Sequence, residues 1–155
     1  MWRTANEAYV ESSLLSADPV ALVRLCYRNC AEAVRDARRH LANGEIRERS
    51  KAISRASGIL VKLLATLDRQ RGGEIALNLA RLYDYMLRRL NEANLRQADE
   101  PLAEVLNLLA TLTEAWDGVI EALRPAATPM NETETWTARN AYGPALAMAE
   151  HSWSF

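Results

Sequence analysis

The chain has 155 residues, which suits one domain with a substantial core, since folding at this size hides about 70% of the surface that the unfolded chain exposes. Hydrophobic residues make up 49% and charged residues 25%, with only 6 glycines and 5 prolines, a composition that excludes a disordered or collagen-like chain. The formal net charge of −1 provides no overall positive field, so we expect no nucleic acid partner and no binding to anionic lipid.

Neither the cysteines nor the N-terminal residues point to an oxidising compartment or a membrane. Cys26 and Cys30 stand four apart in a helical pattern, where they share a face without the usual geometry of a disulfide. We interpret them as small buried apolar residues. Residues 1–7 lack the charged-then-apolar order of a secretory signal, and no apolar run reaches the roughly 18 residues of a membrane span. We therefore expect a cytoplasmic protein without membrane insertion.

The first predicted helix opens at Asp18-Pro19, because Asp caps helix N-termini and Pro suits the first turn. It ends at Asn43-Gly44, a pair that tolerates the left-handed conformation of a helix C-terminus. Its apolar stripe is Val23, Tyr27, Cys30, Val34, Ala37 and Leu41.

The second predicted helix runs from about Glu45 to Asp68, and Gly72-Gly73 breaks the pattern after it. Its inward positions are Ile53, Ala56, Leu60, Leu63 or Leu64, and Leu67.

The third predicted helix starts near Glu74, and the fourth starts at the Asp99-Glu100-Pro101 cluster and ends before Pro125. Both carry apolar residues at spacings of three and four. The third stripe is Ala76, Leu79, Tyr83, Met86, Leu90 and Ala93, and the fourth is Leu102, Val105, Leu109, Leu112, Trp116, Val119 and Leu123.

Short connections between four helices of matched length force neighbours to run antiparallel. The sequence thus predicts an all-α fold, an up-down-up-down four-helix bundle over residues 18–124. Residues 1–17 would form an N-terminal cap segment. Residues 125–155 would form an irregular C-terminal tail, because the composition shifts there to three prolines, one glycine and scattered aromatic residues.

Two of the helices carry more apolar residues than a bundle core needs. The second has Ile59, Val61 and the extra member of the Leu63-Leu64 pair, and the fourth has Leu106 and Leu108. Surplus apolar area on a small protein indicates a partner or an oligomer. The alternative is that residues 1–17, with their apolar Tyr9, Val10, Leu14 and Leu15, cover it.

Nothing in the residue pattern favours catalysis or a bound cofactor. A di-metal centre in a helical bundle needs Glu-x-x-His pairs, and neither His40 nor His151 is preceded by Glu at that spacing. A bundle mutase would need buried Arg and Glu, whereas most arginines here fall off the apolar stripes. We expect no enzymatic activity, no metal and no cofactor.

The run from Asn78 to Asn94, NLARLYDYMLRRLNEAN, resembles the signature of the FliS family of flagellar secretion chaperones. Tyr9 followed by the Ser16-Ala-Asp-Pro19 run is similar to the family's N-terminal tyrosine and helix start. Leu67-Asp68 with Gly72-Gly73-Glu74 resembles its second loop, and Trp116 stands at the usual tryptophan of its last helix. The resemblance covers about Tyr9 to Leu123, in order.

The chain departs from the family pattern at two places. The first long helix of the family commonly carries a Met-Leu-Tyr-Asp-Gly segment, whereas this chain has Leu25-Cys-Tyr-Arg-Asn29, so that only Tyr27 is kept. The tail from Ala126 to Phe155 has no counterpart in the resemblance.

The resemblance implies a bundle that binds the C-terminal segment of flagellin in the cytoplasm, prevents premature polymerisation and delivers the client to the flagellar export gate. An amphipathic client segment would lie in apolar grooves between helices. We expect the groove or its cap to involve these residues: Tyr9, Tyr27, Ile53, Ile59, Leu60, Leu64, Tyr83, Tyr85 and Leu106.

Several assignments stay open at the level of sequence. Ile53, Leu60 and Leu64 fit either the core or the groove, while Tyr83 and Trp116 fit the core stripe. Tyr85 faces outward if Tyr83 faces inward. The alternative function is a helical scaffold or oligomerisation module that does not bind flagellin.

Overall fold

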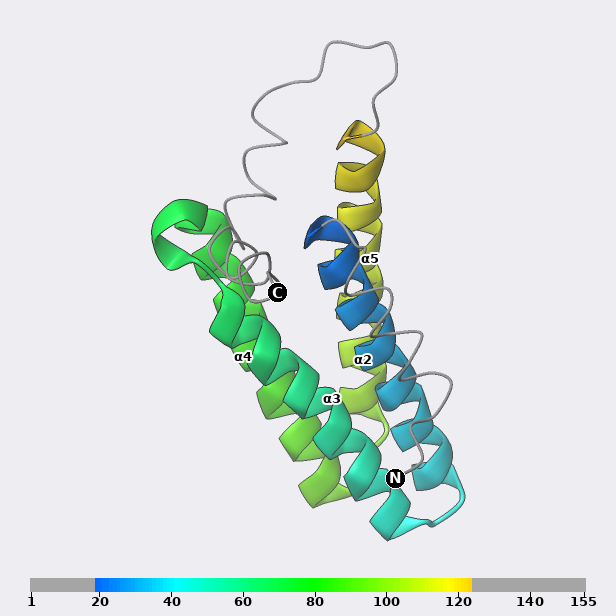
Figure 1. Ribbon diagram of the computed structural model, residues 1–155. Coiled ribbons are helices and arrows are strands. Elements are labelled where there is room, and N and C mark those ends of the chain that lie inside the picture. The colour runs from blue at the N-terminus through cyan, green and yellow to red at the C-terminus, as the bar shows by residue number, and fades with distance from the viewer. Residues whose placement is uncertain (1–18, 124–155) are drawn as a thin grey trace, which may run out of the picture.

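The computed structural model describes residues 19–123, which form four helices joined by short connections (Figure 1). The helices are α2 (Pro19–Ala42), α3 (Ile46–Thr66), α4 (Arg69–Arg96) and α5 (Glu100–Leu123). No strand occurs within this range. The expected all-α four-helix bundle is confirmed, whereas the expectations for residues 1–17, for Asp18 and for residues 125–155 lie outside the described residues.

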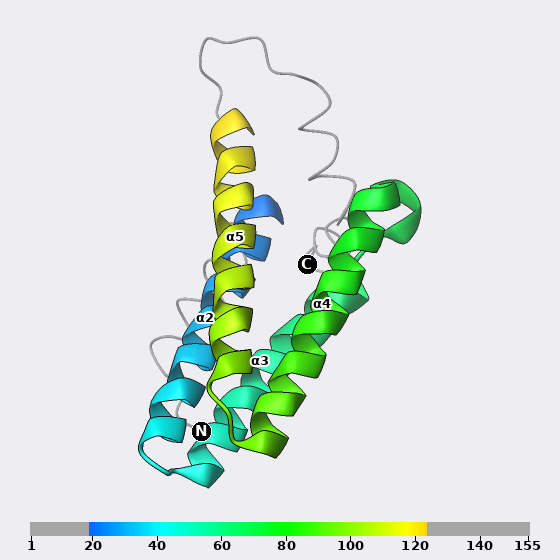
Figure 2. The same cartoon turned by 180° about the vertical axis from the view of Figure 1, so that it is seen from behind.

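The helices form two pairs that meet closely at one end only. α2 packs on α3 and α5, and α4 completes the bundle by packing on the other sides of α3 and α5. Figures 1 and 2 show the α2/α5 pair and the α3/α4 pair close together at the end that holds residues 43–45 and 97–99. Toward the other end, where α4 begins and α5 ends, the two pairs diverge.

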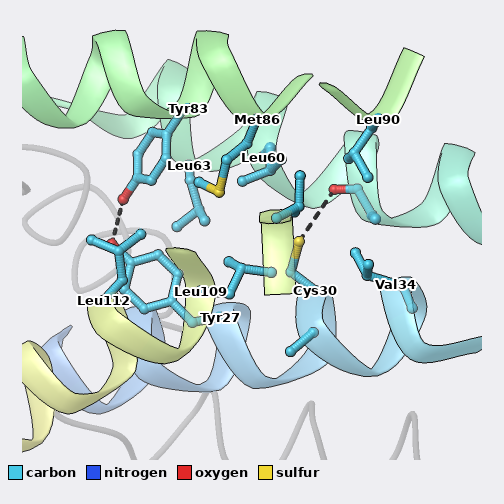
Figure 3. Close-up of a cluster of buried hydrophobic side chains, with 14 of the residues drawn as sticks. Tyr27, Cys30, Val34, Leu60, Leu63, Tyr83, Met86, Leu90, Leu109 and Leu112 are labelled. Carbon is cyan, nitrogen blue, oxygen red and sulfur yellow. Dashed lines mark hydrogen bonds between the residues drawn. The ribbon is translucent and has the colours of Figure 1, made fainter. Parts of the chain in front are cut away.

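The core is built from the apolar stripes that the spacing predicts. Its largest fully buried side chains include Tyr27, Tyr83, Leu60, Met86, Leu90 and Leu109 (Figure 3). The hydroxyls of Tyr27 and Tyr83 share a hydrogen bond, and the ring of Tyr27 also lies 6.3 Å from that of Trp116 between centroids. Since Trp116 is only 7% exposed, it fills the core as expected.

The end of α2 follows the predicted Asn43-Gly44 signal. Gly44 has φ = +72°, and its N–H donates to the carbonyl of Leu41, while the N–H of Glu45 donates to the carbonyl of His40. These two bonds form a Schellman motif, in which a left-handed residue satisfies the last carbonyls of the helix. The side chains of His40 and Glu45 close the same turn at 2.5 Å.

The break expected at Gly72-Gly73 is present at Gly73, but the predicted start near Glu74 is wrong, because α4 already begins at Arg69. Asp68 is the reason: its carboxylate accepts from the N–H groups of Gln70 and Arg71, which caps one additional turn. The interruption is confined to Gly73, with φ = 52° and ψ = −132°, after which the helix resumes.

Candidate binding surface

Four of the predicted site residues lie in the core. Tyr27, Leu60 and Tyr83 are completely buried and Ile53 is 4% exposed. Their burial favours the core alternative for Ile53 and Leu60, because a partner that approaches the closed bundle does not reach them. Contact with flagellin at these four positions stays a prediction and requires the helices to move apart.

Three predicted site residues are half-buried and lie on three different seams between helices. Ile59 stands one turn after Arg55, which pairs with Asp36 of α2 at 2.7 Å, so it lies toward α2. Leu64 stands about four turns after Ser50, which bonds to Asn94 of α4, so it lies toward α4. Leu106 faces α2. The structure therefore does not unite these three side chains in one groove, and Tyr9 lies outside the described residues.

Leu106 lines a hollow of about 380 Å³ between α2 and α5. Ala31, Leu106 and Ala110 contribute apolar surface, and Arg28 contributes a cation. The lining is completed by Glu32, Arg35, Thr113 and Glu114. The hollow is thus apolar with charged side chains of both signs around it.

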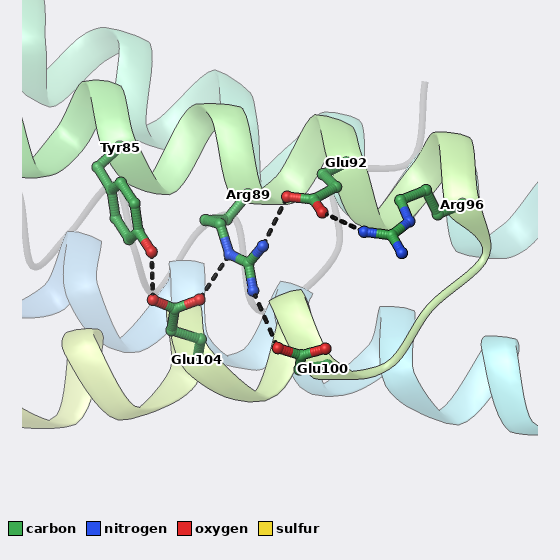
Figure 4. A network of polar contacts seen from close by, with 6 residues as sticks. All are labelled: Tyr85, Arg89, Glu92, Arg96, Glu100 and Glu104. Atoms are coloured by element: carbon green, nitrogen blue, oxygen red, sulfur yellow. Dashed lines mark hydrogen bonds and ion pairs between the residues drawn. The ribbon is translucent and has the colours of Figure 1, made fainter.

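Tyr85 is exposed as predicted, but its hydroxyl is engaged by α5. Figure 4 shows the hydroxyl of Tyr85 donating to Glu104, whose other oxygen accepts from Arg89 Nε at 2.5 Å. Arg89 also donates to Glu92 at 2.6 Å, and Glu92 accepts from Arg96 at 2.7 Å. These bonds tie α4 to α5 near the connection between them.

The pKa values within this cluster follow from the shared hydrogen bonds. The bond to the Glu104 carboxylate raises the pKa of Tyr85, since ionisation would lose the donor and place two anions together. The bonds from Tyr85 and then Arg89 hold the pKa of Glu104 below its ordinary value. At neutral pH Glu104 therefore stays ionised, while Tyr85 keeps the proton that it donates.

Beyond this cluster the same seam becomes apolar toward the diverging end of the bundle. Counting back from Arg89 and Tyr85 in steps of three and four, the α4 face continues through Leu82 and Leu79 to Ile75. Counting forward from Glu104, the α5 face continues through Leu108, Ala115 and Val119, with the polar Thr111 between Leu108 and Ala115. We call these six residues the α4/α5 apolar surface: Ile75, Leu79, Leu82, Leu108, Ala115 and Val119.

The side chains of this surface are incompletely covered. Ile75 is 41% exposed and Ala115 is exposed, while Leu79, Leu82, Leu108 and Val119 are half-buried at the edge of the core. The sequence identifies Leu108 as an apolar residue beyond the needs of the core. It assigns Leu79 and Val119 to the core, and it assigns Ile75 and Leu82 to neither the core nor a binding surface. The contacts of Tyr85 and Arg89 with Glu104 set the helical phase, which turns all six positions toward the seam between α4 and α5, where the two helices diverge.

Other exposed apolar side chains lie apart from this surface. Leu77 is 42% exposed but stands two residues from both Ile75 and Leu79, which turns it to the opposite side of α4. Ile46 and Leu95 are 57% and 75% exposed at the other end of the bundle. They serve as controls for the surface.

Cys30 is completely buried, as expected of a small apolar residue, and Cys26 is half-buried. Burial raises the pKa of Cys30 to about 12, and its thiol donates to the carbonyl of Ala56 at 3.6 Å. Burial also raises the pKa of Cys26. Within residues 19–123 no group of three or more His, Cys, Asp or Glu side chains is placed to hold a metal ion.

A buried polar contact between α3 and α4 was missing from the sequence analysis. Arg49 is 3% exposed and lies 3.4 Å from both the carbonyl and the side-chain oxygen of Asn94, which also accepts from Ser50 at 3.0 Å. In the sequence this contact is indicated by spacing alone, because Arg49 precedes Ile53 by four residues and so lies on the inward stripe of the second predicted helix. It joins the helices near the closed end of the bundle.

None of the helices in the described part has the length and apolarity that crossing a membrane requires.

Comparison with known proteins identifies the bundle. The family model described as flagellar protein FliS matches residues 2–123. The flagellar secretion chaperone FliS of Salmonella typhimurium is 43% identical over 108 residues, 69% of this chain and 80% of the relative. Flagellar secretion chaperone FliSB of Pseudomonas aeruginosa is 38% identical over 74% of this chain and 90% of the relative. Flagellar secretion chaperone FliS of Bacillus subtilis is 30% identical over 76% of this chain and 86% of the relative. The chain belongs to the FliS family of flagellar proteins.

Proposed function

We propose that this protein is a cytoplasmic export chaperone that binds the C-terminal segment of flagellin, prevents premature polymerisation and delivers the client to the flagellar export gate. The observation that carries the proposal is the family match across residues 2–123, together with relatives named flagellar secretion chaperones. Binding and release of a client require neither a cofactor nor catalysis.

The surface of the bundle fits an extended amphipathic client. α5 borders both the hollow at Leu106 and the α4/α5 apolar surface, so a segment that crosses α5 reaches apolar side chains on both sides. Docking an amphipathic helix in such grooves repays the several kcal/mol lost when a disordered segment becomes ordered. Surface grooves are also reached without opening the core.

The proposal is tested by titrating the full chain with a peptide of about 40 residues from the C-terminus of the flagellin encoded in the same genome. We expect a one-to-one complex in calorimetry and size-exclusion chromatography. Ala110→Glu places a charge in the hollow from an exposed position, so we expect Kd to rise about tenfold, as loss of 1–2 kcal/mol of apolar contact predicts.

Leu95→Glu is the control, because Leu95 is exposed far from the hollow and its replacement should leave Kd within about twofold. Thermal melting checks that both variants fold. If the wild-type chain does not bind the peptide and forms a stable homo-oligomer, the result supports the scaffold function and contradicts the chaperone proposal.

A further inference from the structure

The α4/α5 apolar surface lies where the described chain ends. α5 ends at Leu123 at the diverging end of the bundle, which is also where α4 begins (Figure 2). Ile75 and Leu79 lie near the start of α4. Residue 124 continues from the end of α5 that carries Val119. The other end of the same seam is already closed by the contacts of Arg89 and Tyr85 with Glu104.

Residues 124–155 lie beyond the family match, which ends at residue 123. Their sequence nonetheless contains one regular apolar stripe: Tyr142, Leu146, Ala149 and Trp153 follow each other at spacings of four, three and four. Pro144 suits the first turn of a helix. A helix over 144–155 would be about 18 Å long and would place Leu146, Ala149 and Trp153 on one face.

The chemistry of this segment matches an apolar surface better than a charged one. Residues 141–155 contain one acid, Glu150, and no lysine or arginine. Tyr and Trp are enriched at interfaces because they supply large apolar area with little loss of rotamer freedom. Such a segment docks by burial of apolar side chains, and salt weakens that contact little.

A tether makes even a weak contact effective. The connection from Arg124 to Gly143 is about 20 residues, so its typical span of roughly 25 Å reaches the surface from the end of α5. A linker of this kind gives an effective concentration of about 1 mM. A segment whose free Kd is about 0.1 mM would then be docked about nine tenths of the time.

We propose that residues 141–155 dock on the α4/α5 apolar surface and act as an internal competitor of flagellin. The inference rests on the proposed function, because it gives the tail the same surface as the client. Flagellin must displace the tail, so its apparent affinity falls by the fraction of chains whose surface is free. The competition makes capture selective for clients that bind strongly enough to displace the segment.

The first test needs no flagellin. Amide hydrogen exchange is measured on the full chain and on the full-length double variant Leu146→Asp/Trp153→Asp, and residues 75–86 of α4 and 108–119 of α5 are compared. We expect exchange there to rise up to about tenfold in the double variant, since a segment docked nine tenths of the time slows local opening by that factor. Trp136→Ala, an aromatic replacement off the stripe, should leave exchange unchanged.

Equal exchange in the wild-type chain and the double variant would overturn the inference. Protection that depends on protein concentration would assign the surface to a second copy, and protection lost on Tyr9→Asp but not in the double variant would assign it to residues 1–17. Either result also overturns docking of the tail.

The second test measures the competition. The flagellin peptide should bind the double variant about tenfold more tightly than it binds the wild-type chain, at low and at high salt alike. If neither protein binds the peptide, the proposed function fails while the exchange result stands. If exchange changes but the peptide affinity does not, the tail docks without competing, and the competitor role is wrong.

Discussion

Tyr83 and Tyr85 illustrate how helical phase separates two similar side chains. Tyr83 is buried with its hydroxyl bonded to Tyr27 of α2, whereas Tyr85, two residues on, reaches across the surface to Glu104 of α5. A change of 200° around the helix axis decides which neighbour each one contacts. Both tyrosines of the signature run therefore tie helices together in the free protein.

Cys30 gives a prediction at high pH. Burial raises its pKa from 9.0 to about 12, so between these values the unfolded chain has lost a proton that the folded chain keeps. Stability is then lost as the pH rises, by up to about 1.4 kcal/mol per pH unit for one proton. We expect the free energy of urea unfolding to fall more steeply between pH 9 and 10.5 in the wild-type chain than in Cys30→Ala.

The comparison is between slopes, because the alanine variant is also less stable at every pH from lost packing. Parallel slopes for the two proteins would show that the buried thiol does not titrate with unfolding and would contradict the prediction.

At the scale of the element, Gly73 sets the start of the long uninterrupted part of α4. Its φ of 52° with ψ of −132° is a conformation that residues with a Cβ atom rarely adopt. Gly73→Ala should therefore lower the free energy of unfolding by about 1–3 kcal/mol, measured by urea denaturation.

Gly58 is the matched control within the helical part of the chain. It lies inside α3 with φ below zero, and no atom stands within 4 Å of an added Cβ. Gly58→Ala should raise stability by about 0.5–1 kcal/mol, because alanine is the better helix former. Equal effects at the two glycines would indicate that the conformation at Gly73 imposes no strain.

At the scale of the whole molecule, the bundle is closed at one end by polar contacts that join the two helix pairs. Arg38 of α2 binds both carboxylate oxygens of Asp99, at 2.6 and 2.7 Å, and Arg89 of α4 binds Glu104 of α5. These contacts lie near the connection between α4 and α5. At the diverging end the same seam carries apolar side chains instead. The polar contacts of Arg89 with α5 therefore join the two helices at one end of the bundle.

We expect the contacts of Arg89 to stabilise the packing of α4 on α5. Arg89→Ala should lower the melting temperature by about 3–5 °C at low ionic strength, and less in 1 M NaCl, because salt screens partly exposed charges. Amide exchange should rise in α4 and α5 before it rises in α2.

The neighbouring Arg88→Ala is the control, since Arg88 is exposed and has the same helix propensity. It should shift the melting temperature by less than about 1 °C. A similar fall in melting temperature in both variants would show that the contacts of Arg89 with Glu92 and Glu104 do not stabilise the bundle, and it would contradict the prediction.

The four helices, their inward stripes, the Asn43-Gly44 ending and the burial of Trp116 were predictable from the sequence, because periodicity of three and four residues and local capping are properties of short segments. Asp68 as a cap was equally local, but the stronger glycine signal at Gly72-Gly73 concealed it. The family was also readable from the run between Asn78 and Asn94.

Only the tertiary structure decided which partly apolar positions meet. Ile59, Leu64 and Leu106 share a character in the sequence but face α2, α4 and α2 respectively from different helices, because the rotation of each helix about its axis is fixed by packing. Ile75, Leu82 and Leu108 are turned toward the seam between α4 and α5 for the same reason. A stripe tells which side of a helix is buried, whereas the angle between helix pairs determines how much of that side is left open.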